Sequence, residues 1–180
     1  MYTKTNFQSF KQQFISMSSS PSQPSETSNL LVSCLNVELI LIQAEVSSAK
    51  KLLQEMARLL TIPLDTEIKE KDVYHCLLER EKLGNTGIGN GVALPHSRCS
   101  DATNAIVAII SLKEGVDYDS ADRQPVDLAF GLLVPEDANQ DHLNLLADIA
   151  RLMSTPENKR KISAVQSGKE MISTIKNIAK

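Results

Sequence analysis

The chain has 180 residues, a net charge of −3 and a hydrophobic fraction of 42%, which indicate one globular domain with some length to spare. No block of Lys and Arg offers the footprint of a nucleic-acid or membrane-surface binder, and no apolar run approaches the roughly 20 residues that cross a bilayer. Three widely spaced cysteines fit neither a disulfide framework nor a zinc site. We therefore expect reduced thiols, a cytoplasmic location, and no metal or other cofactor.

The N-terminal segment differs in composition from the rest. Residues 18–28 (SSSPSQPSETS) are rich in Ser and Pro, which predicts a disordered linker. Ahead of them, Phe7, Phe10 and Phe14 share one face of a short helix. That face is either a docking helix, a weakly structured tail or sequence upstream of a true start at Met17. We favour a tail, and divide the chain into a disordered segment 1–27 and a folded domain 28–180.

The first half of that domain alternates between strand and helix patterns. Residues 38–43 (ELILIQ) predict a strand. A helix begins at Ser47 or Ser48 and runs to about Leu60, with an apolar stripe along one side. Residues 71–83 predict a second helix that stops at Gly84.

The second half begins with β-branched runs. Residues 92–94 indicate a short strand, and 105–112 (AIVAIISL) and 126–134 (VDLAFGLLV) predict buried strands joined by a polar loop, 113–125.

Helical patterns then follow at 141–153, after Pro156 and from Ser167 or Gly168. The order predicts an α/β sandwich: a central mixed, mainly parallel sheet of about five short strands flanked by helices.

Four of the seven glycines lie within GNTGIGNG, residues 84–91. This density indicates irregular backbone or a close approach to a ligand, as in phosphate-binding loops. Neither the Rossmann nor the Walker A spacing is met, so no nucleotide site is indicated. A tight loop between helix and strand is the simpler interpretation of the glycines alone. The residues that would cradle a phosphoryl group are Asn85, Thr86, Gly87, Gly89, Asn90 and Gly91.

His96 follows Pro95 at the end of the short strand 92–94. Strand ends are where α/β folds place chemistry, and a histidine is largely neutral at pH 7, with a lone pair that can attack phosphorus. Backbone N–H groups of a neighbouring glycine-rich loop would suit the phosphoryl oxygens. A lone histidine is otherwise more often structural.

The segment 79–96 (EREKLGNTGIGNGVALPH) resembles the phosphorylation-site signature of enzyme IIA of the bacterial sugar phosphotransferase system, mannitol/fructose type. The similarity is greatest to the nitrogen-regulatory branch. It continues through 122–135 and 141–153 in the family's order, and covers essentially residues 28–180. Ser97 stands where this family often has glycine, which bears on loop geometry and the partner surface.

The resemblance implies a role for three side chains. His96 matches the phosphorylated histidine, His142 the second active-site histidine, and Arg80 the arginine that offsets phosphate charge. A guanidinium fork suits phosphate oxygens, and a helix first turn favours an anion at His142. As alternatives, Arg80 and His142 are solvated surface residues. His75 matches nothing in the pattern.

The resemblance also implies a function and partners. We expect a phosphotransferase whose His96 accepts a phosphoryl group from an HPr-like phosphocarrier, and which acts on regulated target proteins according to its phosphorylation state. Two alternatives stay open: a sugar-specific IIA that passes phosphate to a separate IIB component, and a non-catalytic interaction module. No nucleic acid and no membrane insertion are expected.

Overall fold

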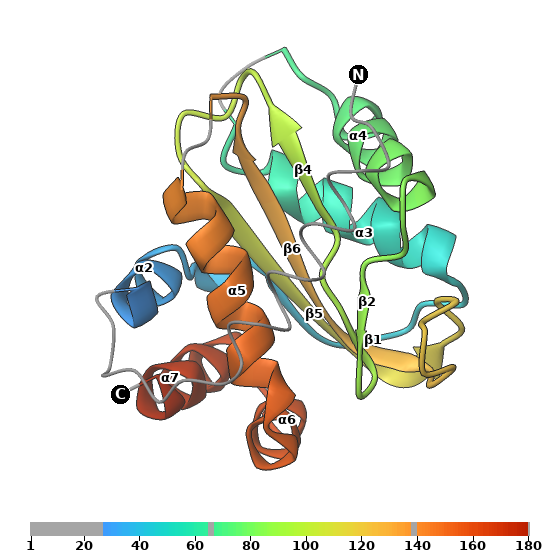
Figure 1. Ribbon diagram of the computed structural model, residues 1–180, viewed down its shortest axis with the longest axis vertical. Coiled ribbons are helices and arrows are strands. Elements are labelled where there is room, and N and C mark those ends of the chain that lie inside the picture. The colour runs from blue at the N-terminus through green and yellow to red at the C-terminus, as the bar shows by residue number, and fades with distance from the viewer. Residues whose placement is uncertain (1–26, 65–66, 138–139, 180) are drawn as a thin grey trace.

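The computed structural model describes residues 27–64, 67–137 and 140–179; the predicted N-terminal segment lies almost wholly outside them. Within these residues a six-stranded sheet has the order β1-β5-β6-β3-β2, and β4 also pairs with β6. Helices cover both faces, with α3 and α4 on one face and α2, α5 and α7 on the other (Figure 1). The predicted α/β sandwich with a mixed sheet is confirmed.

The sheet is built around two long strands, β5 (Ile106–Val116) and β6 (Val126–Pro135), which pair antiparallel. The outer neighbour of β5 is β1 (Ile40–Ala44), which is parallel to it. Two short strands, β3 (Val92–Ala93) and β4 (His96–Cys99), run parallel to β6 one after the other. The last strand, β2 (Gly87–Gly89), is antiparallel to β3.

Strand β5 is longer than its sequence indicates. Residues 113–116 belong to β5, whereas we expected a polar loop from 113 to 125. Lys113 and Glu114 are exposed, but Val116 is buried and pairs with Val126 of β6. The extension follows from antiparallel pairing with a neighbouring strand, which overrides weak strand propensity.

The helices begin and end close to the predicted positions. Ser48 caps α3 (Ala49–Thr61), and its side chain accepts a hydrogen bond from Lys51 N–H. The next helix is α4 (Glu70–Lys82). The C-terminal helices are α5 (Gln140–Ser154), α6 (Pro156–Ser163) and α7 (Gly168–Ile178). Two short helical segments were not predicted: α2 (Thr27–Ser33) and the 3-10 helix η2 (Val37–Leu39).

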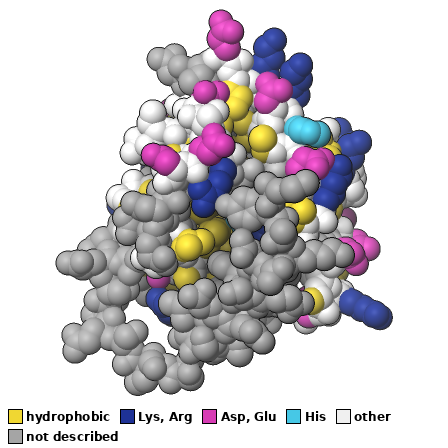
Figure 2. All heavy atoms as spheres, turned by 45° about the horizontal axis from the view of Figure 1, so that its top comes forward, with side chains coloured by type: hydrophobic (Ala, Val, Ile, Leu, Met, Phe, Trp, Pro, Cys, Tyr) yellow, Lys and Arg dark blue, Asp and Glu magenta, His cyan; other side chains and the backbone are white. Residues whose placement is uncertain are grey.

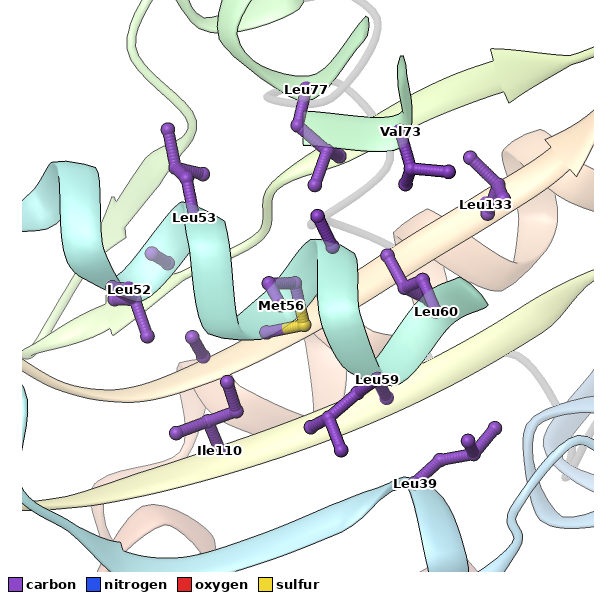
Figure 3. Packing of buried hydrophobic residues seen from close by; sticks show 14 of the residues in the cluster. Leu39, Leu52, Leu53, Met56, Leu59, Leu60, Val73, Leu77, Ile110 and Leu133 are labelled. Carbon is purple, nitrogen blue, oxygen red and sulfur yellow. The ribbon is translucent and has the colours of Figure 1, made fainter. Parts of the chain in front are cut away.

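The core lies on both faces of the sheet, because residues of β6 alternate between them. Ala129 and Leu133 pack toward α3, whereas Leu128, Phe130 and Leu132 pack toward the C-terminal helices. Figure 3 shows the first of these faces, where side chains of α3 and α4 lie over the sheet. Strand β6 is buried along almost its whole length, and it pairs with β4 and with the histidine that begins β4.

Candidate functional site

His96 is the first residue of β4, where the chain rejoins the sheet after Pro95. The Pro95 carbonyl oxygen accepts a hydrogen bond from Leu132 N–H at 2.9 Å, and His96 itself pairs with Leu132. Because proline has no N–H, the ladder along β6 is interrupted between β3 and β4. The interruption places His96 at a break in the ladder with its side chain only half-buried.

Both ring nitrogens of His96 have a partner. Nδ1 lies 2.8 Å from the carbonyl oxygen of Leu94, and Nε2 lies 3.1 Å from Nε of Arg80. A carbonyl only accepts and a guanidinium only donates, so these contacts assign the hydrogen to Nδ1 and the lone pair to Nε2. The ring is thus held in one tautomer, with its nucleophilic nitrogen directed at Arg80.

The environment of His96 favours the neutral ring. Burial, and then the positive charge of Arg80, lower the pKa of His96 from 6.5 to about 4, while the hydrogen bond to Leu94 acts in the opposite direction. A group whose charged form is disfavoured in this way stays unprotonated at neutral pH. The lone pair on Nε2 is therefore available over the physiological range.

This shift in pKa predicts an acid dependence of stability. Between pH 6.5 and 4 the unfolded chain binds a proton at His96 that the folded chain does not. The free energy of unfolding therefore decreases as the pH is lowered through this range, and it levels off below about pH 4. When the pH is lowered from 7.5 to 4.5, the free energy of unfolding of the unmodified chain is expected to decrease by about 2 kcal/mol more than that of its His96→Gln variant. This figure is reduced because the His96 side chain is partly exposed. Urea unfolding of both proteins at the two pH values measures this difference, and equal losses would contradict the assigned environment.

Arg80 reaches His96 from the last turn of α4. Its Nη1 donates to the carbonyl oxygen of Gly84 at 3.0 Å, which fixes the guanidinium against the segment that leaves the helix. Burial lowers the pKa of Arg80, and the nearby Glu81 and Tyr118 oppose that effect. An arginine remains charged despite such a shift. The structure thus brings together two of the predicted site residues, Arg80 and His96.

The beginning of the predicted phosphoryl loop lies beside Arg80 and is held by side chains. Asn85 Nδ2 donates to the Tyr118 carbonyl oxygen at 2.6 Å, and Asn85 Oδ1 accepts from Gly87 N–H at 2.8 Å. The N–H of Thr86 donates to Glu81 at 2.7 Å. Gly87 packs so closely that an added Cβ would overlap with Ser120 Oγ.

The end of the predicted loop is a hairpin turn. Asn90 and Gly91 have φ values of 55° and 72°, as in the two-residue Asn-Gly turns that join antiparallel strands. The Gly91 carbonyl oxygen accepts from the N–H groups of Asp127 and Leu128.

The hairpin turn lies away from the imidazole. Val92, just after the turn, pairs with Leu128, whereas His96 pairs with Leu132, four residues farther along β6 and about 13 Å away at the usual rise per residue. The structure does not bring Gly89, Asn90 and Gly91 to His96.

The remaining histidines have different positions. His142 lies in the first turn of α5, and its side chain is outside the described part of the chain, so its approach to His96 stays a prediction. His75 is exposed on α4, and no role is assigned to it.

Two residues near the site were missed in the sequence. Glu81 accepts from Thr86 and from the hydroxyl of Tyr118, and Tyr118 is only 3% exposed. Tyr118 falls in the segment that we expected to be a polar loop. An aromatic residue in such a loop, in a domain with few aromatics, was the signal that could have marked it as buried.

Among the described residues no helix is long and apolar enough to cross a membrane. Over the same part of the chain, no group of three His, Cys, Asp or Glu side chains is placed to hold a metal ion.

Comparison with known proteins identifies the family. Residues 33–178 match the family described as phosphoenolpyruvate-dependent sugar phosphotransferase system, EIIA 2. The chain therefore belongs to this family, whose members are phosphotransfer components of that system.

Relatives and solved structures agree with that assignment. The nitrogen regulatory protein of Pseudomonas aeruginosa is 35% identical over 138 residues, or 77% of this chain and 89% of that protein. The nitrogen regulatory protein of Bradyrhizobium diazoefficiens is 39% identical over 138 residues, which is again 77% of this chain and 89% of that protein. The crystal structure of nitrogen regulatory protein IIA-Ntr from Neisseria meningitidis has a TM-score of 0.76 and 37% identity, covering 81% of this chain and 99% of that one. Mannitol IIA from Escherichia coli, at 17% identity and a TM-score of 0.65, covers 78% and 98% and shares the fold.

Proposed function

We propose that this chain is a phosphohistidine carrier with a regulatory role, which accepts a phosphoryl group on Nε2 of His96 from an HPr-like phosphocarrier. The observation that carries the proposal is the paired contact of His96: Nδ1 on the Leu94 carbonyl and Nε2 facing Arg80. It presents one neutral nucleophilic nitrogen next to a fixed positive charge, which is the arrangement that phosphoryl transfer requires.

The transfer conserves charge and protons. The lone pair of Nε2 forms the new N–P bond, while the bond between phosphorus and the donor's nitrogen breaks and its electron pair stays with the donor. The proton on Nδ1 remains in its hydrogen bond to the Leu94 carbonyl oxygen, and this oxygen stabilises the positive charge that the substituted ring acquires. Arg80 stabilises the phosphoryl oxygens, and we assign His142, at the start of α5, as a second donor to them.

The glycine-rich segment supports the site in this proposal. The N–H groups of Thr86 and Gly87 already donate to Glu81 and Asn85, so they are not free for phosphoryl oxygens. The hairpin turn at Asn90 and Gly91 lies farther away. We therefore infer that the loop positions Arg80 and His96, and that Arg80 and His142 make the direct contacts.

A protein partner is consistent with the surface near these residues. Leu83, three residues beyond Arg80, is 61% exposed, and Leu143, next to His142, is also exposed. Figure 2 shows one face of the molecule, and outside its grey atoms apolar side chains lie among acidic and basic ones. Exposed apolar side chains such as Leu83 and Leu143 suit docking of a phosphocarrier and, afterwards, of a regulated target.

A regulatory role is favoured over dedicated sugar uptake. The nitrogen regulatory proteins match this chain at 35% and 39% identity over 77% of its length. The fructose-specific EIIABC component of Bacillus subtilis matches at 33% over 61% of the chain. The sugar-specific alternative is retained as an outcome of the experiment, because it predicts onward transfer to a IIB component.

The experiment is incubation of the full chain with phosphoenolpyruvate, enzyme I and an HPr-like carrier, followed by intact-mass measurement. We expect a gain of one phosphoryl group that is labile in acid, stable in alkali and absent when the carrier is omitted. Onward transfer to a IIB protein would favour the sugar-specific role. No gain at all would overturn the proposal in favour of a non-catalytic interaction module.

A further inference from the structure

Three side chains form a hydrogen-bonded cluster beneath the site: Glu81 at the end of α4, Thr86 in the following loop, and Tyr118 after β5. Glu81 Oε1 accepts from Thr86 N–H at 2.7 Å, and Oε2 accepts from the Thr86 hydroxyl at 2.5 Å and from the Tyr118 hydroxyl at 3.1 Å. Thr86 and Tyr118 are 5% and 3% exposed. The half-buried carboxylate thus joins three segments of the chain through three donors.

The cluster is connected to the Nδ1 side of the imidazole. The carbonyl oxygen of Thr86 accepts from Leu94 N–H at 2.9 Å, and the carbonyl oxygen of Leu94 lies 2.8 Å from Nδ1 of His96. A shift of Thr86 would therefore move the peptide carbonyl that determines which ring nitrogen carries the hydrogen.

The cluster is also connected to the Nε2 side. Gly84 N–H donates to the Glu81 carbonyl oxygen at 3.1 Å, and the Gly84 carbonyl oxygen accepts from Nη1 of Arg80. The short segment between Glu81 and Thr86 thus holds the guanidinium whose Nε faces His96. Both partners of the imidazole, Leu94 and Arg80, are attached to the same six-residue stretch, residues 81–86.

The protonation states of Tyr118 and Glu81 favour the hydrogen bonds of the cluster. Burial, followed by the charge of Glu81, raises the pKa of Tyr118, so its hydroxyl keeps its hydrogen and remains a donor to the carboxylate. The negative charge of Glu81 in turn offsets part of the cost of burying Arg80. Charge-assisted hydrogen bonds of this kind are stronger than neutral ones.

We propose that Glu81, with Thr86 and Tyr118, is the positioning group that holds His96 in its Nδ1–H tautomer with Nε2 toward Arg80. Its effect on phosphoryl transfer rests on the function proposed above. Its effect on the imidazole does not, because the tautomer is a property of the chain alone.

The test compares Glu81→Gln with Glu79→Gln in the full chain. Glu79 lies on the same helix but is exposed and pairs with Lys82 at 2.7 Å, so its variant is the matched control. A glutamine at 81 keeps the size of the side chain but has one acceptor oxygen in place of two. We expect phosphoryl acceptance from the HPr-like carrier to slow by about tenfold in Glu81→Gln, since small displacements of reacting groups reduce rates by such factors.

The second measurement is the tautomer of His96, from two-bond proton–nitrogen NMR spectra at neutral pH. We expect a single Nδ1–H form in the unmodified chain and in Glu79→Gln, and a mixture of both tautomers in Glu81→Gln. A folded Glu81→Gln protein with an unchanged tautomer and rate would overturn the proposal.

A milder variant covers the case in which Glu81→Gln does not fold. Tyr118→Phe removes one of the three donors to Glu81, and we expect a smaller change of the tautomer and rate in the same direction. An unchanged tautomer and rate in Tyr118→Phe would then overturn the proposal. If the unmodified chain takes no phosphoryl group, the proposed function fails, whereas the tautomer comparison still decides the role of Glu81.

Discussion

Replacing His96 with alanine is expected to abolish phosphoryl acceptance, so that the intact mass stays unchanged after incubation with phosphoenolpyruvate, enzyme I and an HPr-like carrier. The reason is that Nε2 of His96 supplies the only electron pair in the proposed N–P bond. The pKa of about 4 leaves that pair free at neutral pH, whereas an ordinary histidine would be partly protonated. Alanine offers no replacement nucleophile.

The matched control for this prediction is His75→Ala. His75 is exposed on α4, the helix that also carries Arg80, and the structure gives it no part in the site. We expect this variant to gain one phosphoryl group at the same rate as the unmodified chain. Full modification of a folded His96→Ala protein, or loss of modification in His75→Ala, would contradict the assignment of the nucleophile.

Replacing Arg80 with glutamine is expected to slow phosphoryl acceptance by about a hundredfold, the usual scale for losing one preorganised charge-stabilising donor. Glutamine has nearly the length of the arginine stem but no charge to stabilise the phosphoryl oxygens. The same change removes the second cause of the low pKa of His96, while burial, the larger cause, remains. The pKa of His96 should therefore rise from about 4 only part of the way toward 6.5.

Initial rates of mass gain and an NMR titration of the His96 ring measure the two effects of Arg80→Gln. Arg98→Gln is the control, because Arg98 is exposed on β4 close in sequence to His96 and donates to the Glu136 carbonyl oxygen. The control should leave both the rate and the titration unchanged. A normal rate in Arg80→Gln would show that the contact with His96 is structural and has no part in the transfer.

The main helices and the long strands were predictable because their patterns are local. The apolar stripe of α3 and the β-branched runs of β5 and β6 carry the periods of helix and strand in the residues themselves. The end of β5 was not predictable, since Lys113 and Glu114 favour a loop and only pairing with β6 extends the strand. The two-residue strand β3 is about the shortest strand that a local sequence pattern can indicate.

The glycine-rich run shows how one pattern can contain two structures. Its composition indicated a single phosphate-binding loop, and no feature of the local sequence separates its two ends. In the structure, Asn85 and Thr86 hold the segment beside Arg80, whereas Asn90 and Gly91 form a hairpin turn. The turn at positive φ joins two strands, β2 and β3, whereas the simpler interpretation of the sequence was a tight loop between helix and strand.

The sequence by itself determined the family, the candidate nucleophile and the candidate arginine, because these depend on which residues stand at which spacing. Only the tertiary structure decided that Arg80 meets Nε2 of His96, that Leu94 holds Nδ1, and that Glu81 connects to both. These contacts join α4 and the loop that follows it to Leu94 and His96, which the pairing of β3 and β4 with β6 holds in place. Tautomer and pKa are consequences of that three-dimensional environment, and a linear pattern carries no information about it.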